Sequence, residues 1–116
     1  MKKILIFEYI TGGGLIEKKV DNSLLFEAEI ILNSLIETYN YNVNFFCDYR
    51  HSFRHKKGAI TVSNDNTEII YDSKFINKYD FYLPICPETH MIYYTYLKKI
   101  TDSVNNMNLS SAETIF

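Results

Sequence analysis

Gly12, Gly13 and Gly14 follow Glu8, the acid that closes the first apolar run of the chain. Backbone N–H groups in a glycine turn can approach an anion closely, and ligands of open α/β proteins bind where parallel strands end. The pattern is neither G-x-G-x-x-G nor a P-loop with its Lys-Ser/Thr, so it does not predict a dinucleotide or Walker-type site. Two interpretations stay open: an anion-approach or interdomain loop, and a plain flexible turn.

Glu8 would stand at the end of a strand buried on both faces. An unpaired carboxylate in such a place costs several kcal/mol unless it reaches solvent or a partner. We expect Glu8 either to face a crevice or to accept hydrogen bonds from N–H groups of the loop that follows it.

Further polar residues follow two later apolar runs. Asp48 and Arg50 alternate along an extended segment, so they would share a face, where they could pair with each other or Arg50 could bind an anion. A surface ion pair is the alternative. Glu88 follows Pro87 at the start of an expected helix, as a ligand-facing acid or as a complement to the helix dipole.

Cys47, His51 and His55 have side chains that can bind metal, but their spacing matches no zinc pattern and no fourth ligand is evident. The basic loop "RHSFRHKK" could contact phosphate or RNA, although one cationic loop on a slightly acidic domain is usually a solvated turn. No Ser/His/Asp or Cys/His arrangement can be assembled from the sequence alone.

The elements that would position these residues follow from hydrophobic periodicity. The run at 3–9 is apolar up to Glu8, as in a central strand of a parallel sheet, and the run at 43–47 predicts a second strand. Between them Ser23 is a plausible N-cap of a helix. Apolar residues at helical spacing predict the face that packs on the sheet: Leu24, Ala28, Ile31, Leu32 and Leu35.

Shorter patterns continue the chain. Residues 60–62 and 68–71 suggest a small hairpin or strand pair, and 74–78 one or two helical turns. "DFYLPIC" predicts a buried strand with Pro84 near its end or at a bulge, and a helix follows from Pro87. A last short strand is expected at 107–109. These elements predict a three-layer Rossmann/flavodoxin-like α/β domain with a mainly parallel sheet of about four to five strands.

Bulk properties exclude several classes of protein. The chain has 116 residues, room for one domain, and its net charge of -2 gives no basic footprint for nucleic acid. The basic start lacks a long apolar run and a cleavage site, and nothing approaches a transmembrane length. Two well-separated cysteines favour reduced thiols, so we expect a cytoplasmic protein that contacts neither membrane nor nucleic acid.

The last residues, "SSAETIF", place Ser110 three residues before Glu113, the spacing of a capping box that begins a helix. A helix needs about three turns to be stable. We therefore expect residues 1–109 to form the α/β domain and 110–116 to begin the next helix of a longer protein.

The order of motifs resembles the N-terminal pre-ATP-grasp domain of ATP-grasp enzymes, and is most similar to the branch that includes tyramine-glutamate ligase. The segments that carry the resemblance span nearly the whole chain: "FEYITGGGL", "SLLFEAEIIL", "DYR", "PICPETHMI" and "LSSAETI". The resemblance implies a doubly wound domain before an ATP-grasp core, in a ligase that activates a carboxylate with ATP and Mg²⁺ for attack by an amine.

The resemblance also implies that the matching motif residues line the face toward the core and a small carboxylate or amine substrate: Glu8, Gly12, Gly13, Gly14, Glu27, Asp48, Arg50, Pro87 and Glu88. Two positions depart from the family pattern, Ala28 where a glycine is common and Cys86 where an alanine is common. The lysines and acids that hold ATP and Mg²⁺ in that family belong to the later domains. This chain would then hold no cofactor and no catalytic residue of its own.

Two other readings remain. The chain could be a stand-alone flavodoxin-like module that binds a small anion at the glycine rim. It could also be an interaction domain or homodimer that docks through the tyrosine-rich segment "MIYYTYL", although tyrosines at helical spacing more often pack in the core.

Overall fold

The computed structural model describes residues 2–39, 42–87 and 91–103 of the chain. The strands in these residues are β1 (Ile4–Glu8), β2 (Val43–Asp48), β3 (Ala59–Val62) and β4 (Phe81–Ile85). The helices are α1 (Asn22–Thr38), α2 (Ser73–Ile76) and α3 (Ile92–Ser103), with two short 3₁₀ helices, η1 (Ser52–His55) and η2 (Thr67–Tyr71).

The four strands form one all-parallel sheet in the order β3-β2-β1-β4. Ile4 of β1 pairs with Val43 of β2 on one side and with Phe81 of β4 on the other. The sheet confirms the expected α/β class of Rossmann/flavodoxin-like type and the central position of the first strand.

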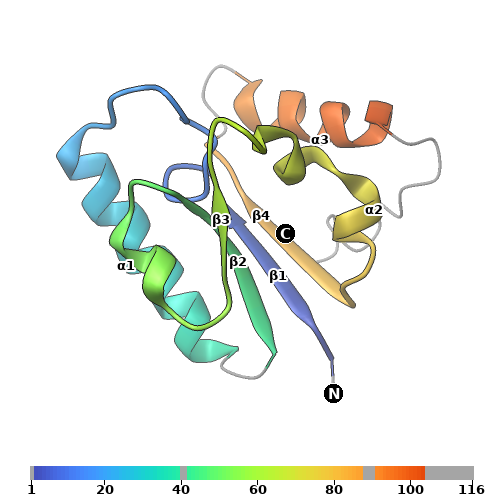
Figure 1. Ribbon diagram of the computed structural model, residues 1–116, viewed down its shortest axis with the longest axis horizontal. Helices are drawn as coiled ribbons and strands as arrows, with labels where there is room; N and C mark the ends of the chain where they lie inside the picture. Colours follow the sequence, from blue (N-terminus) through green and yellow to red (C-terminus); the bar gives the residue numbers. More distant parts are fainter. Residues whose placement is uncertain (1, 40–41, 88–90, 104–116) are drawn as a thin grey trace.

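Helices cover both faces of the sheet, which gives three layers (Figure 1). On one face Leu32 of α1 packs with Ile6 and Phe45. On the other face α2, α3 and η2 bury a second cluster against the sheet, which includes Leu5, Phe7, Phe46, Ile70, Ile76, Tyr96 and Ile100. The side chains of β1 alternate between the two clusters, as expected for a strand buried on both faces.

The order of the strands places all their carboxyl ends at one rim. The chain moves outward from β1 to β2 to β3, then returns to β4 on the other side of β1, so the strand order reverses beside β1. In open α/β sheets ligands bind at the carboxyl rim, near such a reversal.

Two expectations about α1 are wrong. The N-cap is Asp21 and not Ser23, because the Asp21 carboxylate accepts the Ser23 N–H at 2.7 Å and the helix starts at Asn22, two residues earlier than expected. Leu24 and Ile31 are 50% and 44% exposed, since the helix packs on the sheet mainly through a narrower stripe around Ala28.

The expected hairpin at 60–62 and 68–71 is also wrong. The first segment lies in β3, which pairs in parallel with β2, and the second forms η2. A short apolar run can fit the two-residue period of a strand or the period of a helix. Here a 3₁₀ turn buries Ile70 in the core.

The expected strand "DFYLPIC" is confirmed as β4, which stands at the edge of the sheet formed by the described strands and in which Pro84 pairs with Phe7. An edge strand tolerates proline because only one of its sides carries a ladder. The described part of the last helix begins at Ile92, whereas the expected helix start from Pro87 runs through residues 88–90, outside the described residues. The strand expected at 107–109 and the helix expected at 110–116 also lie outside them.

Candidate functional site

The turn that leaves β1 is held by the Glu8 carboxylate. Its Oε1 accepts hydrogen bonds from the N–H of Thr11 at 2.7 Å and from the Thr11 hydroxyl at 2.8 Å, and Glu8 is only 4% exposed. Burial raises the pKa of Glu8, while the hydrogen bonds from Thr11 act in the opposite direction. Of the two interpretations of Glu8, the structure shows the one in which the acid bonds the following loop.

The glycines form a tight turn that uses its own N–H groups. The Gly12 N–H donates to the carbonyl of Glu8 at 2.7 Å, and the Gly14 N–H donates to the carbonyl of Tyr9 at 3.0 Å. A Cβ on Gly12 would stand 2.5 Å from the Glu8 carbonyl oxygen, and one on Gly14 would overlap the Tyr9 ring. These two amides are therefore engaged inside the turn and are not presented to an anion.

The same turn packs on the neighbouring strands. Gly13 has φ of 98°, and a Cβ there would stand 2.8 Å from Val62 at the end of β3. The N–H of Asp48, at the end of β2, donates to the Thr11 carbonyl at 2.7 Å. The structure thus brings Glu8, the glycine turn and Asp48 together at one rim.

Asp48 and Arg50 form a bidentate ion pair. The Asp48 carboxylate, 6% exposed, accepts from Arg50 Nε at 3.0 Å, from Nη2 at 2.6 Å and from the Arg50 N–H at 2.9 Å. The hydrogen bonds that Arg50 donates to this carboxylate raise the pKa of Arg50 above its ordinary value. The pairing interpretation of these two residues is the one that the structure shows.

Arg50 also fastens the long connection between β1 and α1. Its Nη1 donates to the Lys18 carbonyl at 2.7 Å and its Nη2 to the Leu15 carbonyl at 3.0 Å. Arginine suits this position because its planar fork presents several donors at once. The pair with Asp48 therefore holds the connection against the end of β2.

His51 is a residue of this rim that the sequence suggested as a metal ligand and as part of the basic loop "RHSFRHKK". Its Nδ1 accepts the N–H of Phe53 at 3.0 Å and so caps η1, which places the proton of the neutral ring on Nε2. Nε2 lies 3.5 Å from Oε1 of Glu29 on α1, and the His51 side chain is 6% exposed. Residue spacing in the sequence could not show that Glu29 lies near His51, because α1 and the residues after β2 come together only in the folded chain.

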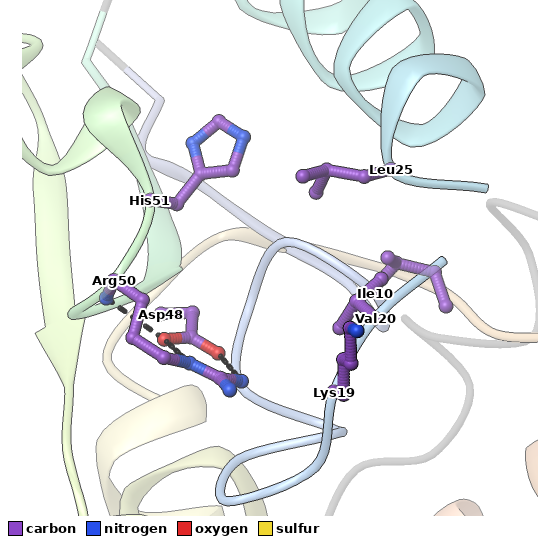
Figure 2. A pocket seen from close by; sticks show the side chains of 7 residues that line it. All are labelled: Ile10, Lys19, Val20, Leu25, Asp48, Arg50 and His51. Carbon is purple, nitrogen blue, oxygen red and sulfur yellow. Dashed lines mark hydrogen bonds and ion pairs between the residues drawn. The ribbon is translucent and has the colours of Figure 1, made fainter. Parts of the chain in front are cut away.

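An open pocket of about 220 Å³ lies between the connection, α1 and the exit of β2 (Figure 2). Figure 2 shows the Asp48–Arg50 pair and His51 on one side and the apolar side chains across from them. The residues that line it are Ile10, Lys19, Val20, Leu25, Asp48, Arg50 and His51.

A second pocket of about 200 Å³ lies where the β1 exit meets α3, lined by Tyr9, Tyr71, Ile92, Thr95, Tyr96 and Lys99. Tyr9 in this pocket and Ile10 in the first are adjacent in sequence, so the turn after β1 contributes to both.

The remaining expected site residues fall elsewhere. Glu27 is exposed on α1 and is not among the residues that line either pocket. Glu88 lies outside the described residues. The rim therefore joins Glu8, Asp48 and Arg50 with the glycine turn, and only Asp48 and Arg50 of these line the first pocket.

The two thiols are poor nucleophiles in this fold. Burial raises the pKa of Cys47 to about 11 and that of Cys86 to about 12. Within the described ranges, no group of three or more His, Cys, Asp and Glu side chains could hold a metal ion. None of the helices in the described part of the chain is long and apolar enough to span a membrane.

The fold and the rim define a Rossmann-like α/β protein with a small pocket beside the exits of its two central strands. Comparison with known proteins adds no closer assignment: no family model, no curated protein and no solved structure matches the chain.

Proposed function

We propose that the chain is the substrate-side and scaffold domain of an ATP-dependent carboxylate-amine ligase of the ATP-grasp type. The observation that carries this proposal is the pocket at the carboxyl rim of a parallel sheet, lined by Asp48, Arg50 and His51. Ligands of open α/β sheets bind at this rim. The order of sequence motifs described above supports the same function.

The rim of this chain does not fit the triphosphate and metal of Mg-ATP. The Gly12 and Gly14 amides donate to backbone carbonyls, and the described residues include no cluster of metal ligands. The pocket of about 220 Å³ is smaller than the roughly 300–1,000 Å³ of drug-sized ligand sites. In our proposal ATP and Mg²⁺ are held by ATP-grasp domains outside this chain, and the chain alone is not catalytic.

The chain's own residues then shape and orient the site of a small substrate. The Asp48–Arg50 pair fixes the connection whose end supplies Lys19 and Val20 to one wall of the pocket. His51 forms the opposite wall and is itself oriented by its hydrogen bond from Phe53. Side chains held in this way keep the pocket preorganised.

Calorimetry of the 116-residue chain with Mg-ATP should show no binding heat. The chain expressed together with the sequence that follows it in its gene should release ADP when given a carboxylate and an amine. Micromolar binding of Mg-ATP by the chain alone, or a stop codon directly after Phe116 with no ligase partner, would contradict the proposal.

A stand-alone module that binds a small anion is the second candidate. It is favoured by Lys19, whose ammonium makes no hydrogen bond or ion pair with the described residues, at a pocket that also holds the buried His51. The assay for ADP release distinguishes the two candidates. An anion-binding module would bind the same ligand, but no longer form of the protein would release ADP.

A third candidate, a docking or homodimer surface at the start of α3, rests on two exposed side chains, Met91 just before the helix at 61% and Tyr94 at 60%. Tyr96 of the same segment is buried in the core, so the surface is smaller than the sequence suggests. Sedimentation at high concentration separates this candidate from the others, because the domain proposed here needs no second copy.

A further inference from the structure

The first pocket has one wall of Asp48, Arg50 and His51, and a facing wall of apolar side chains together with Lys19 (Figure 2). Ile10, Val20 and Leu25 supply the apolar side, and they come from the turn after β1, the connection and the first turn of α1. The pocket volume of about 220 Å³ equals that of roughly seven waters at about 30 Å³ each. A ligand of this site is therefore small and carries a hydrocarbon part.

The Asp48–Arg50 pair has little remaining capacity to bind a ligand. The Asp48 carboxylate accepts three hydrogen bonds from Arg50, and the guanidinium also donates to two backbone carbonyls. A close ion pair whose two charges offset each other presents a nearly neutral wall, even though the Arg50 side chain is 36% exposed. The pair thus shapes the pocket but does not decide the charge of its ligand.

Two polar groups remain for a ligand. One is the ammonium of Lys19, which has no hydrogen bond or ion pair among the described residues. The other is Nε2–H of His51, a donor on a side chain that is 6% exposed; Nε2 lies 3.5 Å from Oε1 of Glu29. That distance is at the limit for a hydrogen bond, and His51 lines the pocket, so a ligand there can supply a closer acceptor.

We propose that this pocket binds a small monocarboxylate with a short aliphatic chain. The binding itself does not require the proposed function; only the role of this acid as a substrate rests on it. The carboxylate lies between Lys19 and Nε2–H of His51, and the aliphatic chain packs on Ile10, Val20 and Leu25. An amine would meet the positive charge of Lys19 and find the Asp48 oxygens occupied. Inorganic phosphate would leave the apolar side uncovered.

The test is a titration of the ¹⁵N-labelled 116-residue chain with pentanoate, followed by NMR. Pentanoate should shift the Nε2 resonance of His51 and the amide resonances of Val20 and Leu25. Pentylamine, which has the same aliphatic chain, and inorganic phosphate should each bind at least about tenfold more weakly, a difference of about 1.4 kcal/mol. Equal binding of pentylamine or phosphate would overturn the assignment of the ligand.

Two variants locate the site. Lys19→Met keeps the aliphatic stem and removes the charge, so it should raise the Kd for pentanoate about tenfold or more. Lys18→Met is the matched control, because Lys18 is also exposed, does not line the pocket, and bonds Arg50 through its backbone carbonyl. A Lys19→Met protein that binds pentanoate like the Lys18→Met protein would overturn the proposal.

His51→Asn is the second test. The Asn oxygen can still accept the Phe53 N–H and so preserve the start of η1, but the variant lacks Nε2–H. We expect it to remain folded and to bind pentanoate about tenfold more weakly. Unchanged binding in a folded His51→Asn protein would contradict the role of Nε2–H.

These results are separable from ligase activity. Ligation by the longer protein without pentanoate binding to this chain would overturn the carboxylate site and leave the proposed function standing. Pentanoate binding at Lys19 and His51 without ligation by the longer protein would support the carboxylate site and overturn the proposed function.

Discussion

Polar residues at the rim mainly hold the backbone. Glu8 binds the turn that follows it, and Arg50 joins Asp48 to the connection before α1. Carboxylates that are buried at strand ends need such partners, because an uncompensated buried charge costs several kcal/mol. The side chains left to meet a ligand are those with fewer internal bonds, Lys19 and His51.

Glu8 should make the stability of the protein depend on pH. Its pKa is raised in the folded state, so its stabilising contribution is complete below the ordinary value of 4.5 and is lost as pH rises through the raised value. Glu8→Gln keeps an oxygen acceptor for Thr11 but cannot ionise. We expect the free energy of unfolding of the variant, relative to wild type, to increase with pH across that window, as measured by urea unfolding. A difference that is constant with pH would contradict this assignment.

Arg50→Met should loosen the connection between β1 and α1. The change removes the donors to the carbonyls of Leu15 and Lys18 and leaves Asp48 buried without its cation. We expect a loss of about 1–3 kcal/mol in the free energy of unfolding and faster hydrogen exchange at the amide of Lys18. Lys57→Met, a change to an exposed lysine, is the control and should alter neither. Unchanged exchange in Arg50→Met would show that the ion pair does not fasten the connection.

The composition of the rim and its Asp48–Arg50 pair could be predicted from the sequence, but the rest of its bonding could not. Asp48 and Arg50 alternate along one extended segment, so their pairing follows from local geometry. The meeting of His51 with Glu29 depends on where α1 lies over the sheet, which residue spacing does not give. The glycines likewise indicate a turn, while the use of the Gly12 and Gly14 amides inside it depends on the path of the chain.

Among the elements, length separates the correct expectations from the wrong ones. β1, β2 and α1 have patterns long enough to distinguish a buried strand from an amphipathic helix, and all three were predictable. Residues 68–71 are too few to show whether the apolar residues repeat with the period of a strand or of a helix. The β-branched residues there favoured a strand, whereas the structure has η2. The start of α1 was predicted two residues too late, because both Asp21 and Ser23 are good N-cap residues.

The packing of α1 is tested by two of its own residues. Leu32 is fully buried against the sheet, whereas Phe26 is 64% exposed. Leu32→Ala should lower the free energy of unfolding by about 2–5 kcal/mol, because it leaves a cavity in the core. Phe26→Ala, the matched truncation on the exposed face, should change it by no more than about 0.5 kcal/mol. Urea unfolding measures both, and similar losses in the two variants would mean that α1 packs through another face.

At the scale of the whole molecule, a single parallel sheet joins the two apolar clusters. The side chains of β1 enter both, so separation of α1 from the sheet removes support from the strand on which the other layer packs. Such an arrangement favours cooperative unfolding of the sheet with its helices. The overall class was predictable because alternating strands and helices leave few other ways to cover an all-parallel sheet.

Alkylation of Cys47 tests this cooperativity in a Cys86→Ser background. Cys47 is fully buried in the cluster under α1, and its raised pKa of about 11 leaves little thiolate at neutral pH. Iodoacetamide should therefore react only when the sheet opens, and the rate should rise with urea as global unfolding does. Leu32→Ala should accelerate labelling by the same factor by which it raises the unfolded fraction, since both report one transition. If the labelling rate of Cys47 changes neither with urea nor with Leu32→Ala, the reagent reaches Cys47 through a local opening. The layers then do not unfold together.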